Sequence, residues 1–394
     1  MDDLRGHAKA STFSVAKAGT TLRMAIDAHA DTAQRILDLG ERFVDEDSAA
    51  EVSLAKAKKG GLGAQFFSIW VDPVVFPGEE AWQRARRLVE AVHAEIGRAP
   101  EALGIARSGA DVRALAARRA FAVLLGAEGA HALGGDGVAW TTRYARLVEL
   151  ARGGVRYLAC TWSNSNDFAG SSGDSGRARG LSQLGHDLVQ ACIALDILLD
   201  VSHVSDATFT DLAEWAQSTG VPLVASHSSA RALANHPRNL TDLQLGTLAD
   251  TGGVASVNFC PAFLDEAFRA EVTAATATPE ARAAQEEARR RESDPGRAAL
   301  YAWHARSAFA RAVPAPGIAR LVDHICHMVR VAGEDHVGLG SDFDGTAAVP
   351  AGLEDVSLLP RLADSLGERG LSGRAIDKIF SDNWLRVLDT HIAG

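Results

Sequence analysis

The chain has 394 residues, of which 47% are hydrophobic and 37 are glycine, so it can bury a large core and form many tight turns. Its net charge of −10 disfavours a nucleic-acid partner, because nucleic acids bind clustered Lys and Arg side chains. No stretch is apolar enough to span a bilayer, and neither a secretory signal at residues 1–5 nor a C-terminal lipid-anchor tail is visible. We therefore expect a cytoplasmic protein that does not bind membranes.

Eight short apolar segments are predicted to form buried strands, because each is bounded by glycine or polar residues and several are rich in β-branched side chains. In chain order they span residues 22–27, 64–71, 121–126, 155–161, 196–201, 222–226, 253–259 and 336–341. Amphipathic helical patterns lie between most of them, for example at residues 81–96, 184–195 and 207–217. Strands that alternate with helices favour an α/β fold, and eight of them favour a closed (β/α)8 barrel of the TIM type.

One long stretch departs from this alternation. Residues 264–313 are rich in Ala, Arg and Glu and carry no strand pattern, so they are predicted to form helices between the seventh and eighth strands. Such an excursion is long enough to cover the mouth of the barrel. The sequence has no internal repeat and no flexible linker, which predicts a single domain over residues 1–394. The four cysteines form no C-x-x-C pair and are expected to be reduced: Cys160, Cys192, Cys260 and Cys326.

Side chains that bind metals follow five of the predicted strands, at the ends that converge on the active site of such a barrel. They are His29 and Asp31 after the first strand, Glu128 after the third, His203 after the fifth, His227 after the sixth and Asp342 after the eighth. A single strand-end histidine is more often a hydrogen-bonded structural residue than a ligand. Six such groups at five strand ends point instead to one shared site. Crowded carboxylates repel one another and are costly to bury, so a cation is their natural partner.

The kinds of donor atom indicate the metal. Imidazole nitrogen and carboxylate oxygen without thiolate suit zinc or another late first-row divalent ion. Six ligands are too many for one tetrahedral site, but they suffice for two ions about 3.5 Å apart that share a carboxylate. His29 and Asp31 lie two residues apart on a strand, so both side chains point to one face and can bind one ion. Four other histidines lack this placement and are expected to be structural: His131, His186, His324 and His327.

Other catalytic patterns are absent from the sequence. The glycines at residues 60–63 are part of neither a G-x-G-x-x-G nor a Walker motif, which disfavours a nucleotide site. The serines around His227 do not form the G-x-S-x-G motif of a nucleophile elbow.

Five strings match one known family closely: GVRYL at 154–158, DVSHVSD at 200–206, SHSSAR at 226–231, HPRN at 236–239 and GSDFDG at 340–345. From about residue 26 to 388 the chain resembles the membrane (renal) dipeptidase family, zinc metallopeptidases of the amidohydrolase superfamily. The resemblance implies a zinc-dependent dipeptidase with two Zn²⁺ per chain, in which a hydroxide that bridges the ions attacks the peptide bond. The implied partner is a small dipeptide-like substrate, and family members are often homodimers.

The resemblance also implies a role for each site residue. His29 and Asp31 would bind the first zinc, Glu128 would bridge both ions, and His203 with His227 would hold the second. Asp342 would contact the metal centre and shuttle the proton, so that Glu128 and Asp342 are the implied catalytic residues. Arg238 matches the arginine that holds the free carboxylate of the substrate, a task that suits a planar guanidinium because it binds carboxylate bidentately.

The chain departs from the family after the fourth strand, where Trp162 stands in place of a histidine that contacts the substrate carbonyl. An indole N–H can donate a hydrogen bond but cannot take up a proton. We expect Asn164 or Asn166 to supply the missing donor and Trp162 to narrow the pocket. This departure leaves an alternative open, in which the same chemistry acts on a modified or conjugated dipeptide of specialised metabolism. A third alternative, a non-catalytic scaffold, is disfavoured because all six metal-binding positions are filled.

Overall fold

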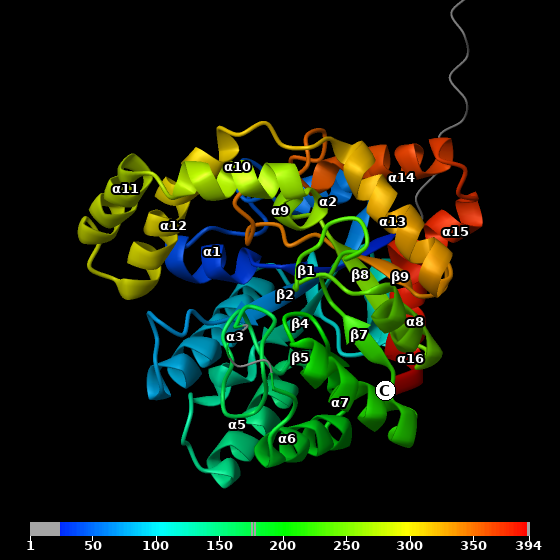
Figure 1. Cartoon of the computed structure of the whole chain (residues 1–394), viewed down its shortest axis with the longest axis horizontal. Coiled ribbons are helices and arrows are strands. Elements are labelled where there is room, and N and C mark those ends of the chain that lie inside the picture. Colours follow the sequence, from blue (N-terminus) through cyan, green and yellow to red (C-terminus); the bar gives the residue numbers. More distant parts are fainter. Residues whose placement is uncertain (1–23, 175, 177–178, 392–394) are drawn as a thin grey trace, which may run out of the picture.

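The computed structural model describes residues 24–174, 176 and 179–391 (Figure 1). Neighbouring strands pair in parallel, and β1 pairs with both β2 and β9, which closes an eight-stranded barrel. The predicted (β/α)8 barrel is therefore confirmed. In order around the ring its strands are β1 (Ala25–Ala30), β2 (Leu62–Trp70), β4 (Phe121–Glu128), β5 (Val155–Ala159), β6 (Leu198–Asp200), β7 (Leu223–Ala225), β8 (Val254–Asn258) and β9 (Val337–Gly340).

Two details differ from the prediction. A ninth strand, β3 (Leu103–Ile105), pairs with the start of β4 beside the barrel, and three residues are too few to show a strand pattern in the sequence. The first barrel strand lies further along the chain than residues 22–27, because β1 ends at Ala30 and so includes His29. The expectations for residues 1–5, and for a strand start at Leu22, concern residues outside the described range.

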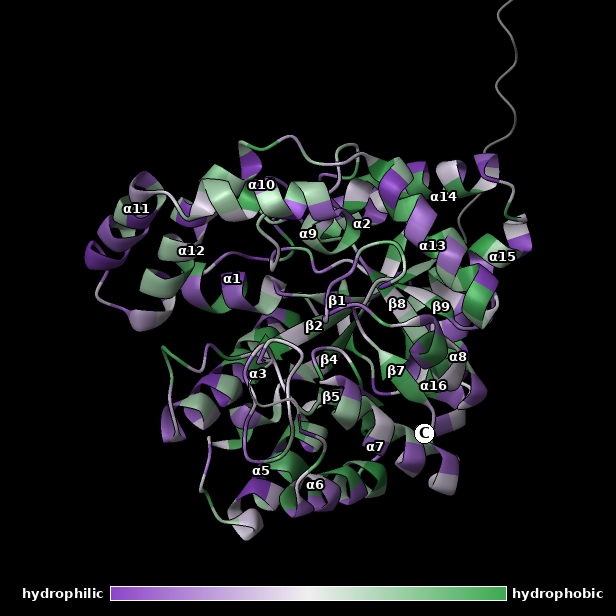
Figure 2. Cartoon of the chain, viewed as in Figure 1, coloured by the Kyte–Doolittle hydropathy of each residue, from purple (hydrophilic) through white to green (hydrophobic). Residues whose placement is uncertain are grey.

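Helices surround the barrel and turn their polar faces outward, as the hydropathy colouring shows (Figure 2). The predicted helices at 81–96, 184–195 and 207–217 are present as α3 (Glu79–Arg98), α6 (Gln183–Ala194) and α7 (Asp206–Thr219). No helix among the described residues is both long enough and apolar enough to cross a membrane. The remaining helices around the barrel are α1 (Thr32–Leu39), α2 (Leu54–Gly60), α4 (Gly109–Ala117), α5 (Trp140–Gly153), α8 (Asp242–Asp250), α13 (Ile318–Ala332), α14 (Leu359–Glu368), α15 (Gly373–Asp377) and α16 (Asn383–His391).

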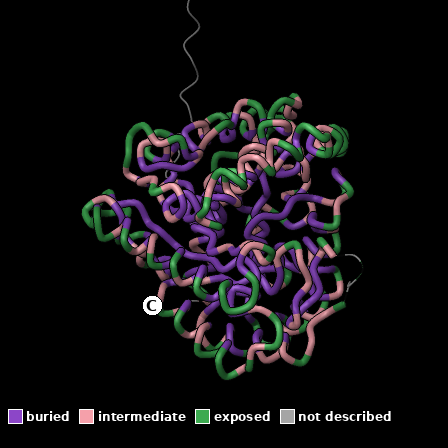
Figure 3. The backbone as a smooth tube through the Cα atoms, turned by 90° about the vertical axis from the view of Figure 1, so that its left-hand side faces the viewer, coloured by how far each residue is buried: buried purple, intermediate pink, exposed green. Residues whose placement is uncertain are grey.

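Apolar side chains fill the inside of the barrel, and the buried part of the chain is concentrated there (Figure 3). The rings of Phe66 and Tyr157 lie 5.1 Å apart, and Phe66 also contacts Trp384 of α16 at 5.0 Å. Gly126 faces Tyr157, and a Cβ atom there would overlap the tyrosine ring. This apolar packing closes one end of the barrel. Polar groups can therefore gather at the opposite end, where the strands have their carboxyl-terminal ends.

The helical segment predicted between the last two barrel strands is present. It consists of α9 (Pro261–Leu264), α10 (Glu266–Thr276), α11 (Pro279–Arg290) and α12 (Pro295–Arg311). Figure 1 shows α12 beside α1, and α11 on the outer side of α12. Each of α10, α11 and α12 begins with a capping side chain that accepts a hydrogen bond from the first turn, namely Asp265, Thr278 and Asp294.

Candidate metal centre

The barrel brings the six predicted metal-binding side chains together at the carboxyl-terminal ends of its strands. They form three overlapping groups, in each of which the ligand atoms lie within 4.8 Å of one another. The groups are His29, Asp31 and Glu128; Glu128, His203 and His227; and His29, His227 and Asp342. Glu128 is shared by the first two groups, and His227 joins the second to the third.

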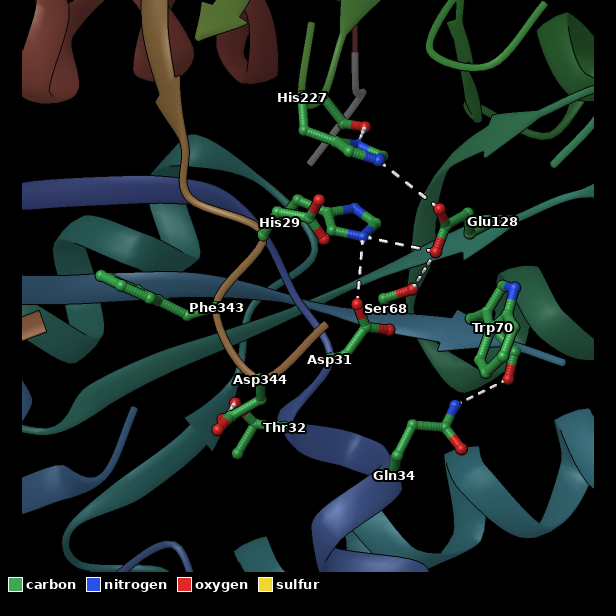
Figure 4. A network of polar contacts seen from close by, with 12 residues as sticks. His29, Asp31, Thr32, Gln34, Ser68, Trp70, Glu128, His227, Phe343 and Asp344 are labelled. Carbon is green, nitrogen blue, oxygen red and sulfur yellow. Dashed lines mark hydrogen bonds and ion pairs between the residues drawn. The ribbon is translucent and has the colours of Figure 1, made fainter. Parts of the chain in front are cut away.

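Glu128, the last residue of β4, lies between the histidines (Figure 4). Its Oε2 atom is 3.3 Å from Nε2 of His29, while its Oε1 atom is 2.7 Å from Nε2 of His203 and 3.4 Å from Nε2 of His227. Ser68 of β2 donates a hydrogen bond to Oε2 at 3.0 Å and orients the carboxylate. Each oxygen of the carboxylate thus faces a different set of imidazoles, which is the arrangement that a bridging ligand needs.

Left-handed backbone turns after the strand ends occur at two of these residues, His203 and Asp342, and at the neighbouring Asp344. His203 has φ 70°, Asp342 has φ 62° and Asp344 has φ 64°, a region that costs free energy for residues with a side chain. The turn after β9 is tied to β1, because the amide of Asp342 donates to the carbonyl of His29 at 3.0 Å. Strain of this kind persists where the surrounding structure fixes the chain, as it does around these groups.

Hydrogen bonds at Nδ1 of His29 and at Nδ1 of His227 determine which nitrogen of each ring faces Glu128. Tyr157 donates its hydroxyl hydrogen to the carbonyl of Ala28 at 3.0 Å, so Nδ1 of His29, 2.9 Å from the same oxygen, must be the donor to it. In the same way, Ser226 donates to Asp200 at 2.6 Å and accepts from Nδ1 of His227 at 2.7 Å. Both Nε2 atoms therefore remain for the site, as in metal-bound histidines with a fixed outer partner.

Electrostatics in the buried cluster favour a cation. Burial lowers the pKa of His203 to about 4 and that of His227 well below its usual value, so both are neutral, and neutral imidazole is the form that binds metals. Burial lowers the pKa of His29, but its contacts with Tyr157, Glu128 and Asp31 outweigh burial and raise that pKa. A proton on Nε2 of His29 thus competes with a metal ion for the same position.

The pKa values of the buried carboxylates in the cluster are also shifted. Burial raises the pKa of Asp342 to about 7 and also raises the pKa of Asp31. Burial opposes ionisation of Glu128 too, but the three neighbouring imidazoles hold its pKa well below the usual value.

The donor atoms fit a pair of divalent cations. The Nε2 atoms of His203 and His227 lie 3.1 Å apart, and two neutral nitrogens at that distance are stabilised by an ion between them. Nε2 of His29 and Oδ1 of Asp31 are buried and have no hydrogen bond to any described residue. Such buried polar atoms are costly unless a ligand satisfies them. The nitrogen and oxygen donors suit zinc, as the sequence predicts.

A cavity of about 460 Å³ opens above this centre, and Arg238 lies in its wall. Arg238 is 5% exposed, and its Nη1 atom donates to the hydroxyl of Ser228 at 2.7 Å. Its Nε and Nη2 atoms have no hydrogen-bond partner among the described residues. A buried guanidinium with two free donors is suited to bind a carboxylate from a ligand in the cavity.

Trp162 also lines the cavity, and its ring lies 6.4 Å from that of His203. The two asparagines suggested as replacement donors are placed differently. Asn164 is not among the residues that line the cavity, and its role in substrate binding stays a prediction. Both ends of the Asn166 side chain are used within its own loop, where its Nδ2 donates to Cys160 and its Oδ1 accepts from the amide of Phe168. Asn166 therefore has a structural role in the loop.

The structure adds groups that sequence analysis did not identify. Asn258, the last residue of β8, donates to Oδ2 of Asp342 at 3.0 Å, and its strand-end position would have revealed it. Tyr157 lies inside the barrel, and no sequence pattern shows that its hydroxyl reaches His29. Of the histidines expected to be structural, His131 contacts the carbonyl of Val71 at 2.8 Å and His186 accepts from Trp215 at 2.8 Å.

Known proteins are similar to this chain in sequence and in fold. The sequence model of the membrane dipeptidase family, peptidase family M19, matches residues 17–392. The chain is 34% identical to an uncharacterized protein in the pqqA 5′ region of Klebsiella pneumoniae, over 79% of this chain and 96% of that protein. It is 31% identical to dipeptidase aclJ of Aspergillus oryzae, over 88% of this chain and 71% of that protein.

Two solved structures are similar over nearly their whole length. The dipeptidase AC, a metallopeptidase of family M19, has a TM-score of 0.73 and 27% identity, and the match covers 93% of this chain and 98% of that one. A metallopeptidase from Rhodobacter sphaeroides, bound to a phosphinate mimic of the dipeptide L-Ala-D-Ala, has a TM-score of 0.71 and 26% identity, with 92% and 98% covered. Because the family match spans almost the entire sequence, the chain belongs to the membrane dipeptidase family, peptidase family M19.

Proposed function

We propose that the protein is a dipeptidase that depends on two zinc ions and hydrolyses the peptide bond of dipeptides. The observation that carries this proposal is the position of Glu128, whose two oxygens face His29 on one side and His203 with His227 on the other. His29 and Asp31 would hold one ion, His203 and His227 the other, and Glu128 would bind both. When bound, such a pair of ions supplies a hydroxide nucleophile at neutral pH and polarises the scissile carbonyl.

The chain's own residues orient the substrate. The two free donors of Arg238 would bind the terminal carboxylate of a dipeptide and place its peptide bond over the metal-binding groups. Fixing the substrate in this way converts the attack into an effectively intramolecular step. An anchor for a free carboxylate so near the centre would restrict substrates to about two residues.

Asp342 is the group proposed to move the proton. It lines the cavity beside His29 and His227, and Asn258 holds its Oδ2 atom. A carboxylate there can accept a proton from the attacking water and pass it to the amine that leaves. Asp342 has the left-handed backbone conformation described above, and its side chain lines the cavity.

The proposal is tested by metal analysis combined with a dipeptide-library screen. We expect freshly purified protein to contain close to two equivalents of zinc and to hydrolyse dipeptides. The variant His203→Ala should lose more than about 100-fold in turnover, since even loss of an outer partner of a ligand costs up to that much. His186→Ala is the matched control, because His186 contacts Trp215 on the outer helices. Unaltered turnover in folded His203→Ala would end the proposal, and metal content near zero would favour a non-catalytic scaffold.

One observation favours a second candidate, the same chemistry on a modified or conjugated dipeptide. Trp162 lines the cavity where the family has a histidine, and its ring packs 5.0 Å from that of Trp70. The variant Trp162→His distinguishes the two candidates when assayed on plain dipeptides. Activity of the wild type on plain dipeptides supports the first candidate. No activity in either protein supports the second.

A further inference from the structure

One side of the cavity is apolar and aromatic. We call it the apolar wall and define it by five lining residues that come from the barrel and from the helical segment above it: Trp70, Phe76, Trp162, Leu300 and Trp303. Four of them are only half-buried, so part of each apolar surface faces the cavity. An apolar surface of this kind inside a binding cavity favours a ligand that covers it.

The part of the apolar wall that comes from β2 and the loop after it lies across the metal centre from Arg238. Trp70 is the last residue of β2, and Phe76 follows in the next loop, whereas Arg238 lies in the loop after β7. Around the ring, β4, β5 and β6 separate β2 from β7 on one side, and β1, β9 and β8 separate them on the other. The two strands are therefore opposite each other in the barrel, with the metal-binding groups between them.

The apolar wall is held in place by one buried ion pair. Arg84 binds Asp38 through Nη1 at 2.6 Å and Nη2 at 2.5 Å, and its guanidinium lies 5.0 Å from the centre of the Phe76 ring. Arg84 also donates to Gln34 at 2.6 Å, and Gln34 donates to the carbonyl of Trp70 at 2.7 Å (Figure 4). The guanidinium of Arg84 therefore helps to position two residues of the apolar wall, Phe76 directly and Trp70 through Gln34.

Helix α12 of the helical segment packs against the same ion pair of Arg84 and Asp38. Gly296, in the first turn of α12, packs so closely that a Cβ atom there would lie 2.5 Å from Oδ1 of Asp38 and 2.9 Å from Nη1 of Arg84. Leu300 and Trp303 follow on the same helix and reach the cavity. The part of the wall from the barrel and the part from α12 are therefore positioned together, which gives the cavity a fixed shape.

We propose that the apolar wall binds the side chain of the amino-terminal residue of the substrate and selects dipeptides in which that residue is large and apolar or aromatic. This inference rests on the proposed function, because Arg238 must hold the carboxylate and the metal centre must hold the peptide bond. Two parts of a dipeptide then remain. The C-terminal side chain stays between the centre and Arg238, and the amino-terminal residue extends from the centre toward the opposite side. There its side chain meets the apolar wall.

The test compares Phe-Gly, Gly-Phe and Gly-Gly as substrates. Burial of an aromatic side chain contributes about 10- to 100-fold, so kcat/KM for Phe-Gly should exceed that for Gly-Gly by this factor. The variants Trp303→Ala and Trp303→Leu should reduce this ratio several-fold and leave the ratio of Gly-Phe to Gly-Gly unchanged. Trp140→Ala is the matched control, because Trp140 contacts Tyr144 on α5, outside the cavity. An equal rate for Phe-Gly and Gly-Gly, or an unchanged ratio in both Trp303 variants, would overturn the inference.

A binding measurement separates failure of this inference from failure of the proposed function. Analogues of Phe-Gly and Gly-Gly with a CH2–NH group in place of the amide cannot be hydrolysed, and calorimetry gives their dissociation constants. Tighter binding of the Phe analogue, lost in Trp303→Ala but kept in Trp140→Ala, supports the apolar wall even if no dipeptide is hydrolysed. Equal binding of both analogues counts against the wall whatever the activity.

Discussion

The hydroxyl oxygen of Tyr157 lies 2.9 Å from Nδ1 of His29, inside a barrel where both residues are completely buried. Because the tyrosine gives its hydrogen to the carbonyl of Ala28, it accepts from the imidazole. The bond therefore fixes both the ring orientation of His29 and the nitrogen that faces Glu128. Tyr157 acts through His29 and is a positioning residue.

The first prediction concerns this bond. Tyr157→Phe keeps the ring that packs on Phe66 but removes the acceptor for Nδ1 of His29. Loss of such an outer partner lowers metal affinity by about 10- to 100-fold, so we expect zinc to bind more weakly by this factor. Competition with a chelator measures the affinity without any assay of activity. Tyr144→Phe, on the partly exposed face of α5, is the control and should bind zinc like the wild type. An unchanged affinity in Tyr157→Phe would mean that the hydroxyl has only a packing role.

Metal removal is expected to destabilise the protein. A ligand that binds only the folded state stabilises it by about 2.7 kcal/mol at a hundred times its dissociation constant. Without the proposed zinc ions, buried carboxylates such as Asp31, Glu128 and Asp342 would repel one another. We expect Tm to fall on treatment with chelator and to recover when zinc is added. In His203→Ala the recovery should be smaller, because one position has lost a ligand. A Tm that does not respond to chelator would contradict the site.

The third prediction tests the carboxylate anchor. Arg238→Lys keeps the positive charge, but a lysine cannot bind a carboxylate bidentately. Loss of a charged hydrogen bond costs about 1.5–3 kcal/mol, so kcat/KM for a dipeptide should fall by about 10- to 100-fold. The informative comparison uses the C-terminal amide of the same dipeptide, which lacks the carboxylate. The preference of the wild type for the free acid over the amide should largely disappear in the variant. If the preference stays the same, another group holds the carboxylate.

The sequence predicts those features of the fold and the site that depend on residues close together in the chain. His203 lies three residues after the end of β6 and His227 two residues after the end of β7, so the rule that strand ends converge in a barrel is sufficient to place them together. Only the resemblance to the family motif marks Arg238 in the sequence, since no strand pattern does.

Features that depend on packing between distant segments were not predictable. Nothing local in the sequence shows that Gly296 fits against Asp38 and Arg84, because that contact joins the helical segment to helices near the start of the chain. The short strand β3 was missed because its three residues carry no periodicity, and its conformation comes from pairing with β4.

The last prediction concerns pH and His324 on α13, which belongs to none of the three metal-binding groups. Its Nδ1 atom accepts from the amide of Ala230 at 3.2 Å and its Nε2 atom lies 3.0 Å from the carbonyl of Leu264, to which it must donate. This pair of contacts requires the neutral ring. Burial accordingly lowers the pKa of His324 to about 4 from its usual 6.5.

The sign of the effect follows from which state binds the proton first. As pH falls below 6.5 the unfolded chain takes up a proton at this position while the folded chain does not, so folding stability decreases until pH reaches about 4. A difference of this size corresponds to about 3 kcal/mol at most. His324→Gln cannot titrate but can still donate and accept hydrogen bonds. In metal-free protein at pH 7, the wild type should have a larger free energy of unfolding than His324→Gln. This difference in free energy should decrease steadily as the pH falls from 6.5 to 4. A constant difference between the two proteins over that range would show that His324 does not carry the effect.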